Sequence, residues 1–266
     1  MSKKIVVIGG SAAGPKAAAR ARRLDQAAEI IMFQRCKELS MASCGFPYYV
    51  GGVFNDRNQL LAAPTGVTRD PTFFMNTKEI IAKVGYEVIK IDRKVKKVHW
   101  KELETGKTGE QEYDKLIITT GSGAKIPPIP GKDLEGITTL ISIQDADFLR
   151  KIRDEKNIKK AIIIGGGLIG IETCEALELA GIEITIVELL PQILTFLDWE
   201  MAKLVENYLV KKGINVITNN GVAAFLGENG KLTGVKLQNG TELPCELAVV
   251  SIGVFPNSEI GKDAGL

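Results

Sequence analysis

Two glycine-rich turns, each lying between two strand-like runs, restrict the possible folds of this chain most strongly. The first turn, Gly9-Gly10-Ser11-Ala12-Ala13-Gly14, follows Ile5–Ile8 and precedes the alanine-rich Pro15–Leu24, which is typical of a helix. The second turn, Gly165-Gly166-Gly167-Leu168-Ile169-Gly170, follows Ala161–Ile164 and completes the G-x-G-x-x-G pattern. Such turns bring the backbone and a helix N-terminus close to a pyrophosphate. Two of them, about 156 residues apart, predict two dinucleotide sites, with a packing device used twice as the alternative.

The residue that follows the second strand of each segment indicates which nucleotide binds. Glu183–Val187 leads to Glu188, close to the spacing at which an acidic residue holds the ribose of NADH. A carboxylate there accepts from a 2′-hydroxyl and repels a 2′-phosphate, and Leu189 and Leu190 supply no cation. The pattern therefore favours NADH over NADPH. In the first segment the strand Glu29–Phe33 ends in Gln34, which can bond a ribose without a charge.

The intervening segments predict the rest of an α/β fold. Tyr86–His99 alternates in polarity and precedes a turn, so it predicts an antiparallel β-meander inserted in the first domain. Ile126–Gly131 is a stiff, proline-rich connector. Glu200–Lys212 is typical of an amphipathic helix, and Leu247–Gly253 of a closing strand.

Composition excludes several classes of function. The 266 residues include 34 basic and 32 acidic residues, so nothing indicates a nucleic-acid partner. No apolar run approaches the roughly 18 residues of a membrane helix, and the N-terminus lacks the features of a secretory signal. We therefore expect a cytoplasmic protein with no membrane partner. The four cysteines show neither zinc spacing nor C-x-x-C, so free thiols are expected.

One cysteine differs from the others in its surroundings. Cys44 lies in Ser40–Gly52, among small residues, a Pro-Tyr-Tyr sequence and a glycine pair. Such a thiol is a nucleophile only if its surroundings stabilise the thiolate or accept its electrons. The alternative is a structural cysteine, which the absence of an apolar period disfavours.

Together these features resemble the flavin-dependent pyridine nucleotide–disulfide oxidoreductases, in particular their single-cysteine branch. The resemblance also includes Tyr113-Asp114-Lys115 before Thr120-Gly121, Ile129-Pro130-Gly131, and Gly253–Asn257. It implies two Rossmann-like three-layer domains, with FAD in residues 1–150 and NAD(P)H in residues 151–266. The implied FAD residues are Gly9, Gly10, Ser11, Ala12, Ala13, Gly14, Gln34, Arg35, Thr120, Gly121 and Gly253, and the implied NAD(P)H residues are Gly165, Gly167, Leu168, Ile169, Gly170 and Glu188.

The resemblance makes Cys44 the redox residue. The nearest other cysteines are Cys36 and Cys174, so the C-x-x-x-x-C of two-cysteine relatives is absent. Cys44 would cycle through a mixed disulfide, a persulfide or a sulfenic acid. We expect NADH-dependent reduction of a small disulfide or persulfide, with coenzyme A disulfide favoured. An NADH oxidase using a sulfenic acid, and a catalytically silent nucleotide-binding module or redox sensor, remain alternatives.

Residues before and after Cys44 bear on the substrate. The first helix carries Lys16, Arg20, Arg22 and Arg23, which can share a face and could meet phosphates, although a solvated basic face is nearly as well supported. In coenzyme A–disulfide reductases the positions of Lys16, Arg20, Arg23, Ser40, Ser43 and Lys78 line the substrate, with asparagine usual at Ser43. Ala12 stands where NADH peroxidase has a histidine, and the one histidine is His99, so peroxide reduction is disfavoured.

The family continues beyond Asn257 with another FAD motif and a dimerisation domain that this sequence does not contain. The resemblance therefore implies a fragment or a natural truncation, and a homodimer for the full-length protein.

Overall fold

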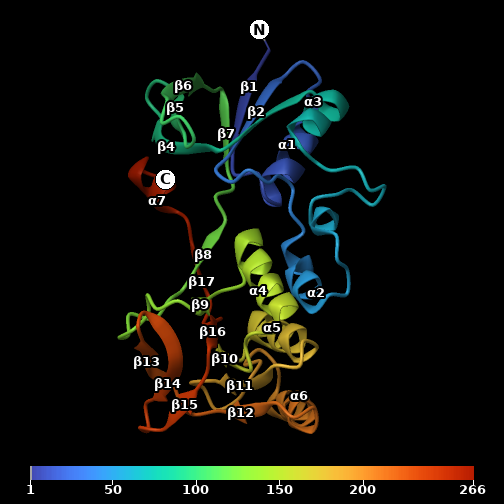
Figure 1. Ribbon diagram of the computed structural model, residues 1–266. Coiled ribbons are helices and arrows are strands. Elements are labelled where there is room, and N and C mark those ends of the chain that lie inside the picture. Colours follow the sequence, from blue (N-terminus) through green and yellow to red (C-terminus); the bar gives the residue numbers. More distant parts are fainter. Residues whose placement is uncertain (1) are drawn as a thin grey trace. The chain divides into compact units, whose positions relative to one another are not determined.

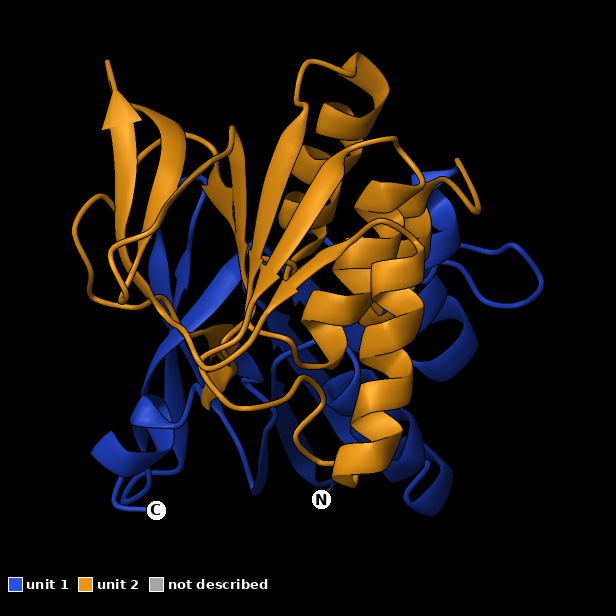
Figure 2. Ribbon diagram, turned by 90° about the horizontal axis from the view of Figure 1, so that it is seen from below, with its two compact units in different colours: residues 1–42, 56–122, 256–266 blue, residues 43–55, 123–255 orange. Residues whose placement is uncertain are grey.

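The computed structural model describes residues 2–266, which form two compact units (Figure 2). Unit 1 comprises residues 2–42, Asp56–Ser122 and Pro256–Leu266, and unit 2 comprises Ser43–Asn55 and Gly123–Phe255. These units are defined by their internal contacts and not by the cofactor that each domain binds. The predicted division into an FAD domain, residues 1–150, and an NAD(P)H domain, residues 151–266, therefore stays a prediction.

The centre of unit 1 is a parallel sheet in the order β3-β2-β1-β7 (Figure 1). Strand β1 pairs with β2 on one side and β7 on the other, which is the arrangement of a βαβ fold. An antiparallel meander, β4-β5-β6, joins β3 to β7. The elements are β1 (Lys4–Ile8), α1 (Ala13–Leu24), β2 (Glu29–Gln34), η2 (Arg57–Leu60), α3 (Pro71–Lys78), β3 (Ile80–Val84), β4 (Tyr86–Asp92), β5 (Lys97–Glu102), β6 (Thr108–Glu112), β7 (Lys115–Ile118) and α7 (Glu259–Asp263).

Successive side chains along β1 and β2 point to opposite faces of the sheet, and each face is covered, so unit 1 has three layers. Val6 and Phe33 face one side of the sheet, where they pack with Val88 and Val98 of the meander. Val7 and Met32 face the other side, where they pack with residues of α1 and α3 such as Ala18 and Phe74. Because both faces are covered, β1 and β2 are almost wholly apolar.

Unit 2 repeats this plan with the parallel order β12-β11-β10-β16-β9 and a meander β13-β14-β15 (Figure 1). Ile162, Val187 and Val250 pack against Phe225 and Val235 of the meander. The elements are η1 (Ser43–Gly45), α2 (Phe46–Gly51), β9 (Ile137–Thr138), α4 (Ile143–Glu155), β10 (Lys160–Ile164), α5 (Leu168–Glu178), β11 (Glu183–Val187), α6 (Trp199–Lys211), β12 (Asn215–Ile217), β13 (Val222–Glu228), β14 (Lys231–Leu237), β15 (Glu242–Pro244) and β16 (Leu247–Val250). Two short strands, β8 (Ser122–Ala124) and β17 (Val254–Pro256), pair where the chain passes between the units.

The predicted α/β fold class with an inserted meander is confirmed, and unit 2 contains a second meander. The segment Ser40–Gly52, which holds Cys44, contains helix α2. The structure shows that Pro47 occupies the first turn of α2 and that Gly52 ends it in a left-handed conformation, so both residues serve as helix ends. His99 lies in the predicted meander, with its Nδ1 3.5 Å from Glu110 Oε1.

The described residues were also searched for membrane-spanning helices and for groups of metal ligands. Across the described residues 2–266, no helix is both long and apolar enough to cross a bilayer. Within the same residues, no group of three His, Cys, Asp or Glu side chains could hold a metal ion.

Candidate functional site

The second glycine turn joins β10 to α5, and its glycines are required by close contacts. Gly165 has φ +104°, and a Cβ there would lie 2.6 Å from the carbonyl oxygen of Ser251. A Cβ on Gly170 would lie 2.1 Å from the carbonyl oxygen of Gly165, so strand and helix could not approach so closely with any other residue. A Cβ on Gly166 would lie 2.5 Å from Ile193.

Gly167 is the exception among these glycines, because a Cβ there would meet no heavy atom of the described chain within 4 Å. Gly167 is also the N-cap of α5 and has no side chain to accept from the first helical turn. The N–H groups of that turn are therefore available to an anion. Leu168 and Ile169, which follow, are exposed at 59% and 38%.

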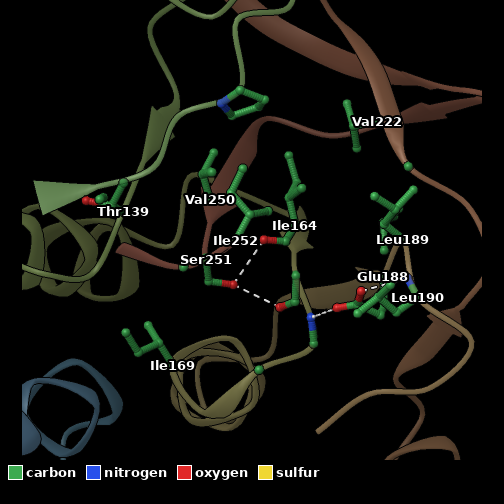
Figure 3. Close-up of a pocket in the computed structure, with 18 of the residues that line it drawn as sticks. Thr139, Ile164, Ile169, Glu188, Leu189, Leu190, Val222, Val250, Ser251 and Ile252 are labelled. Carbon is green, nitrogen blue, oxygen red and sulfur yellow. Dashed lines mark hydrogen bonds between the residues drawn. The ribbon is translucent and has the colours of Figure 1, made fainter. Parts of the chain in front are cut away.

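Glu188 holds the turn from the end of β11. Its Oε2 accepts from the N–H of Gly166 at 2.7 Å, and its Oε1 accepts from the N–H of Leu190 at 2.8 Å (Figure 3). The carboxylate is thereby fixed at the mouth of the turn. Each of its oxygens has capacity for a further hydrogen bond.

The hydroxyl of Ser251 braces the same turn from the end of β16. Its Oγ lies 3.0 Å from the carbonyl oxygen of Ile164 and 2.8 Å from that of Gly165, and it donates toward both (Figure 3). Sequence reasoning missed this residue, because its two partners lie 87 and 86 positions away.

A cavity of about 850 Å³ opens over this turn, entirely within unit 2. Its walls are mostly apolar, with Glu188 and Ser251 among the few polar groups, a composition typical of a small-molecule site. Besides the turn itself, the lining comes from the proline-rich connector, from the residues that follow β9, β11 and β16, and from the meander. It includes Pro127, Ile129, Thr139, Leu189, Leu190, Phe196, Val222 and Gln238.

The first glycine turn, in unit 1, has the same construction. Gly9 has φ +103°, and a Cβ on Gly14 would lie 1.8 Å from the carbonyl oxygen of Gly9. The Thr119 hydroxyl donates to the carbonyl oxygens of Ile8 at 2.8 Å and Gly9 at 3.0 Å. Ser11, Ala12 and Ala13 are exposed at the start of α1.

Gln34 stands at the end of β2 and is buried, at 5% exposure. Its Oε1 accepts from the N–H of Gly10 at 2.9 Å, and its Nε2 donates to the carbonyl of Glu38 at 3.0 Å. Both ends of the amide therefore bond the protein. The neighbouring Arg35 is exposed and lies 3.6 Å from Glu87.

The other predicted cofactor residues lie at the ends of the last strands. The Thr120 hydroxyl donates to the carbonyl of Asn257 at 2.6 Å, and the Asn257 amide donates back to the carbonyl of Thr120 at 2.9 Å. Gly121 and Gly253 both have positive φ, at 70° and 102°.

Cys44 lies in η1, immediately before α2, and is exposed. All four cysteines are free thiols in the described chain. Burial raises the pKa of both Cys174 and Cys245 to about 12, so these two thiols stay protonated at neutral pH. Cys44 is the most accessible thiol of the four, since Cys36 is half-buried.

The predicted substrate residues are divided between the units. Lys16, Arg20 and Arg23 lie exposed along α1, and Ser40 (φ 52°) donates its N–H to the carbonyl of Gly10. Lys78 ends α3, with its Nζ 5.9 Å from the ring centroid of Phe73. Ser43 belongs to unit 2 together with Cys44.

Arg22, which the sequence groups with these cations, has a structural role. Its guanidinium donates to the carbonyls of Gln26 at 2.7 Å, Glu79 at 2.8 Å and Lys78 at 3.1 Å. These bonds tie the end of α1 to the end of α3 and leave Lys16, Arg20 and Arg23 as the exposed cations of the helix.

Comparison with known proteins gives a consistent result. Residues 3–266 match the family model described as pyridine nucleotide-disulphide oxidoreductase. The chain is 30% identical over 263 residues to the NADH oxidase of Methanocaldococcus jannaschii (98% of this chain, 57% of the relative) and 29% identical over 257 residues to the coenzyme A disulfide reductase of Staphylococcus haemolyticus (97% and 55%). Among solved structures, the NAD-dependent persulfide reductase from A. fulgidus superposes with a TM-score of 0.95 at 39% identity, covering 99% of this chain and 48% of that one. The chain thus spans about half the length of the relatives it matches.

Proposed function

Because the chain belongs to the pyridine nucleotide-disulphide oxidoreductase family, we propose that it uses NADH and FAD to reduce a low-molecular-weight disulfide or persulfide at Cys44. The observation that carries the proposal is an exposed, unpaired Cys44 in the same unit as a cavity built on a glycine turn. The similarity of the chain to a coenzyme A disulfide reductase and to a persulfide reductase supports this substrate class. A cytoplasmic location and a homodimeric full-length protein belong to the same proposal.

The residues of both turns fit nucleotides. In unit 2, the open space at Gly167 and the first turn of α5 suit a pyrophosphate, and Glu188 suits the ribose hydroxyls of NADH. In unit 1, the start of α1 offers the same backbone groups, and the absence of charge at Gln34 is compatible with FAD. Bound nicotinamide and flavin would together supply an electron pair by hydride transfer.

The protein's own part in the chemistry is thiol–disulfide exchange. The Cys44 thiolate attacks one sulfur of R–S–S–R′, so the S–S bond breaks, Cys44–S–S–R forms and R′–S⁻ leaves. Two electrons and a proton then reduce this mixed disulfide, which releases R–SH and restores the Cys44 thiolate. Because Cys174 and Cys245 are buried with raised pKa values, neither competes as a second nucleophile.

The exposed cations of α1 favour coenzyme A among the possible thiols. Lys16, Arg20 and Arg23 follow one another at spacings of four and three, which places them along one face of the helix. A phosphorylated thiol would gain charge-assisted hydrogen bonds there. Changing Lys16 and Arg20 to Glu should raise KM for coenzyme A disulfide about tenfold and leave KM for cystine, which carries no phosphate, unchanged. Lys90→Glu, on the exposed side of β4, is the matched control.

The deciding experiment follows NADH oxidation with coenzyme A disulfide as acceptor. We expect Cys44→Ser to lower the rate by roughly 100-fold or more, because the nucleophile is lost, and Cys36→Ser to leave it unchanged. A Cys44→Ser variant that reduced coenzyme A disulfide at the wild-type rate would refute the mechanism.

An NADH oxidase is the second candidate, favoured by the match to the Methanocaldococcus jannaschii enzyme. Here Cys44 would pass through a sulfenic acid. Comparing NADH turnover with oxygen and with coenzyme A disulfide separates the two candidates. A colourless protein that cannot be reconstituted with flavin would instead identify a silent nucleotide-binding module.

A further inference from the structure

Cys44 depends on its neighbours for a fixed position. It precedes α2, a helix of six residues, which is too short to be stable alone. Phe46, Tyr49 and Val50 of α2 are buried, at 2%, 8% and 0% exposure. Gly51 packs against α5, since a Cβ there would lie 3.3 Å from Ala176 Cα. What fixes α2 therefore also fixes the thiol.

Arg150 of α4 holds the carboxyl end of α2 with most of its hydrogen-bonding groups. Its Nη1 donates to the carbonyls of Tyr49 at 2.8 Å and Phe54 at 3.3 Å, and its Nη2 donates to Asn55 Oδ1 at 2.7 Å. The guanidinium carbon lies 5.3 Å from the ring centroid of Tyr49. The Arg150 side chain is only 13% exposed, and its bonds to the Tyr49 and Phe54 carbonyls are partly buried, whereas its bond to Asn55 is exposed.

Asp154 and Arg153 complete this arrangement. Asp154 accepts from Arg150 Nε at 2.9 Å and from Arg153 Nη1 at 3.0 Å. These bonds, chiefly that of Arg150, hold the pKa of the Asp154 carboxyl below its usual range. The Arg153 guanidinium packs on Gly52, where an added Cβ would lie 2.4 Å from its Nη2.

Helix α4 is itself firmly anchored. Ser142 Oγ accepts from the N–H of Asp145, and Asp145 Oδ2 accepts in return from the N–H of Ser142 at 3.1 Å, so the two residues form a capping box. Asp145 Oδ2 also accepts from the Thr139 hydroxyl at 2.7 Å. Its buried side, which includes Leu149 at 0% exposure, packs into unit 2. Arg150 thus extends from the well-anchored α4 and binds the short α2, which is not stable alone.

We propose that Arg150 is a positioning residue for Cys44. Given the proposed function, this role is needed because attack on a disulfide requires a thiolate held in line with the S–S bond. Without Arg150, the carbonyl of Tyr49 keeps the N–H of Gly52 at 3.2 Å but loses the shorter bond, and the Phe54 carbonyl and Asn55 Oδ1 lose the bonds that Arg150 donates. We expect Ser43–Asn55 to move more widely as a result. The sequence gives no sign of this role, since Arg150 is about 100 positions from Tyr49, Phe54 and Asn55.

The test reports directly on the motion of side chain 44. In a Cys36→Ser background a nitroxide label is attached to Cys44; the buried Cys174 and Cys245 stay unlabelled. Arg150→Met should at least halve the immobile fraction of the electron paramagnetic resonance spectrum, and should speed amide exchange of residues 43–55 tenfold or more, with less than a twofold change in residues 160–187. Arg150→Lys, which keeps the charge and one donor nitrogen, should restore part of the immobile fraction. Lys151→Met, at an exposed neighbouring position, is the matched control and should change neither readout.

An Arg150→Met spectrum equal to that of the wild type would overturn the proposal. So would faster exchange that is equal throughout residues 43–55 and 160–187, because Arg150 would then only stabilise the fold. Neither readout requires NADH or a disulfide. Failure of the proposed function, tested by Cys44→Ser turnover, is therefore distinguishable from failure of the positioning role.

Discussion

The glycine turns of units 1 and 2 share one backbone arrangement. In both, the first glycine has a φ close to 103° and donates its N–H to the end of the adjacent strand, Gly9 to Phe33 at 2.8 Å and Gly165 to Val187 at 2.9 Å. In both, the carbonyl of the second glycine accepts from a residue in the left-handed region, Ser40 or Leu194, at 2.8 Å. The repeat therefore extends from sheet order to individual hydrogen bonds.

The turns differ in the side chain that holds the second glycine. Gln34 and Glu188 both accept from that glycine's N–H, at 2.9 and 2.7 Å. Gln34 is neutral and buried, whereas Glu188 carries a charge at the edge of a cavity. An amide and a carboxylate thus both brace the turn, and we propose that only the carboxylate also selects among nucleotides.

The largest expected effect is the loss of stability when alanine replaces a glycine that has no room for a Cβ in either turn. Gly14→Ala and Gly170→Ala each place a Cβ about 2 Å from a backbone carbonyl oxygen, so we expect losses of about 3 kcal/mol in the free energy of unfolding. Gly167→Ala meets open space and should cost at most about 1 kcal/mol while weakening NADH binding. Urea denaturation measures the stabilities. A Gly170→Ala variant as stable as Gly167→Ala would show that close packing does not explain the repeat.

These turns were predictable because the glycine pattern itself is local in sequence. Gly14 and Gly170 meet the carbonyl oxygens of Gly9 and Gly165 in their own turns, whereas Gly9 and Gly165 meet the carbonyls of the distant Thr119 and Ser251. Helix α4 also carries a local sequence signal, the capping box of Ser142 and Asp145. The braces Thr119 and Ser251 and the arginine Arg150 could not be found in this way, because their partners lie about 90 to 110 positions away.

The next largest effect is expected on nucleotide affinity when Glu188 and Gln34, the side chains that distinguish the two turns, are each changed into the other. Glu188→Gln keeps the bond to Gly166 but removes the charge, so NADH should bind about tenfold more weakly, since a charge-assisted bond to the ribose is lost. NADPH should bind no worse, because the repulsion of its 2′-phosphate is also lost. Gln34→Glu, in unit 1, should leave NADH affinity unchanged. Fluorescence titration with both nucleotides measures the ratio, and an unaltered preference for NADH in Glu188→Gln would remove Glu188 as the selecting residue.

A smaller effect compares the hydroxyl braces. Ser251→Ala and Thr119→Val each remove a donor to two carbonyls, so each should lower the free energy of unfolding by about 1 kcal/mol. Only Ser251→Ala should weaken NADH binding, because Ser251 lines the cavity of unit 2. Ser251→Thr should restore both properties. If Thr119→Val weakened NADH binding as much as Ser251→Ala, the assignment of NADH to the unit 2 turn would be wrong.

The smallest effect concerns the helices that follow the turns. Ala18 of α1 and Cys174 of α5 lie four residues after the last glycine of their patterns, and both are 0% exposed. Burial, reinforced by Glu178 and Glu175, raises the pKa of Cys174 to about 12, so its thiol packs as a small apolar group. Cys174→Ala, which copies unit 1, should therefore cost only about 1 kcal/mol, from loss of one buried sulfur, with NADH affinity unchanged. A loss above about 3 kcal/mol in urea denaturation would mean that α5 packs on its sheet by contacts that α1 does not reproduce, and the repeat would then end at the turn.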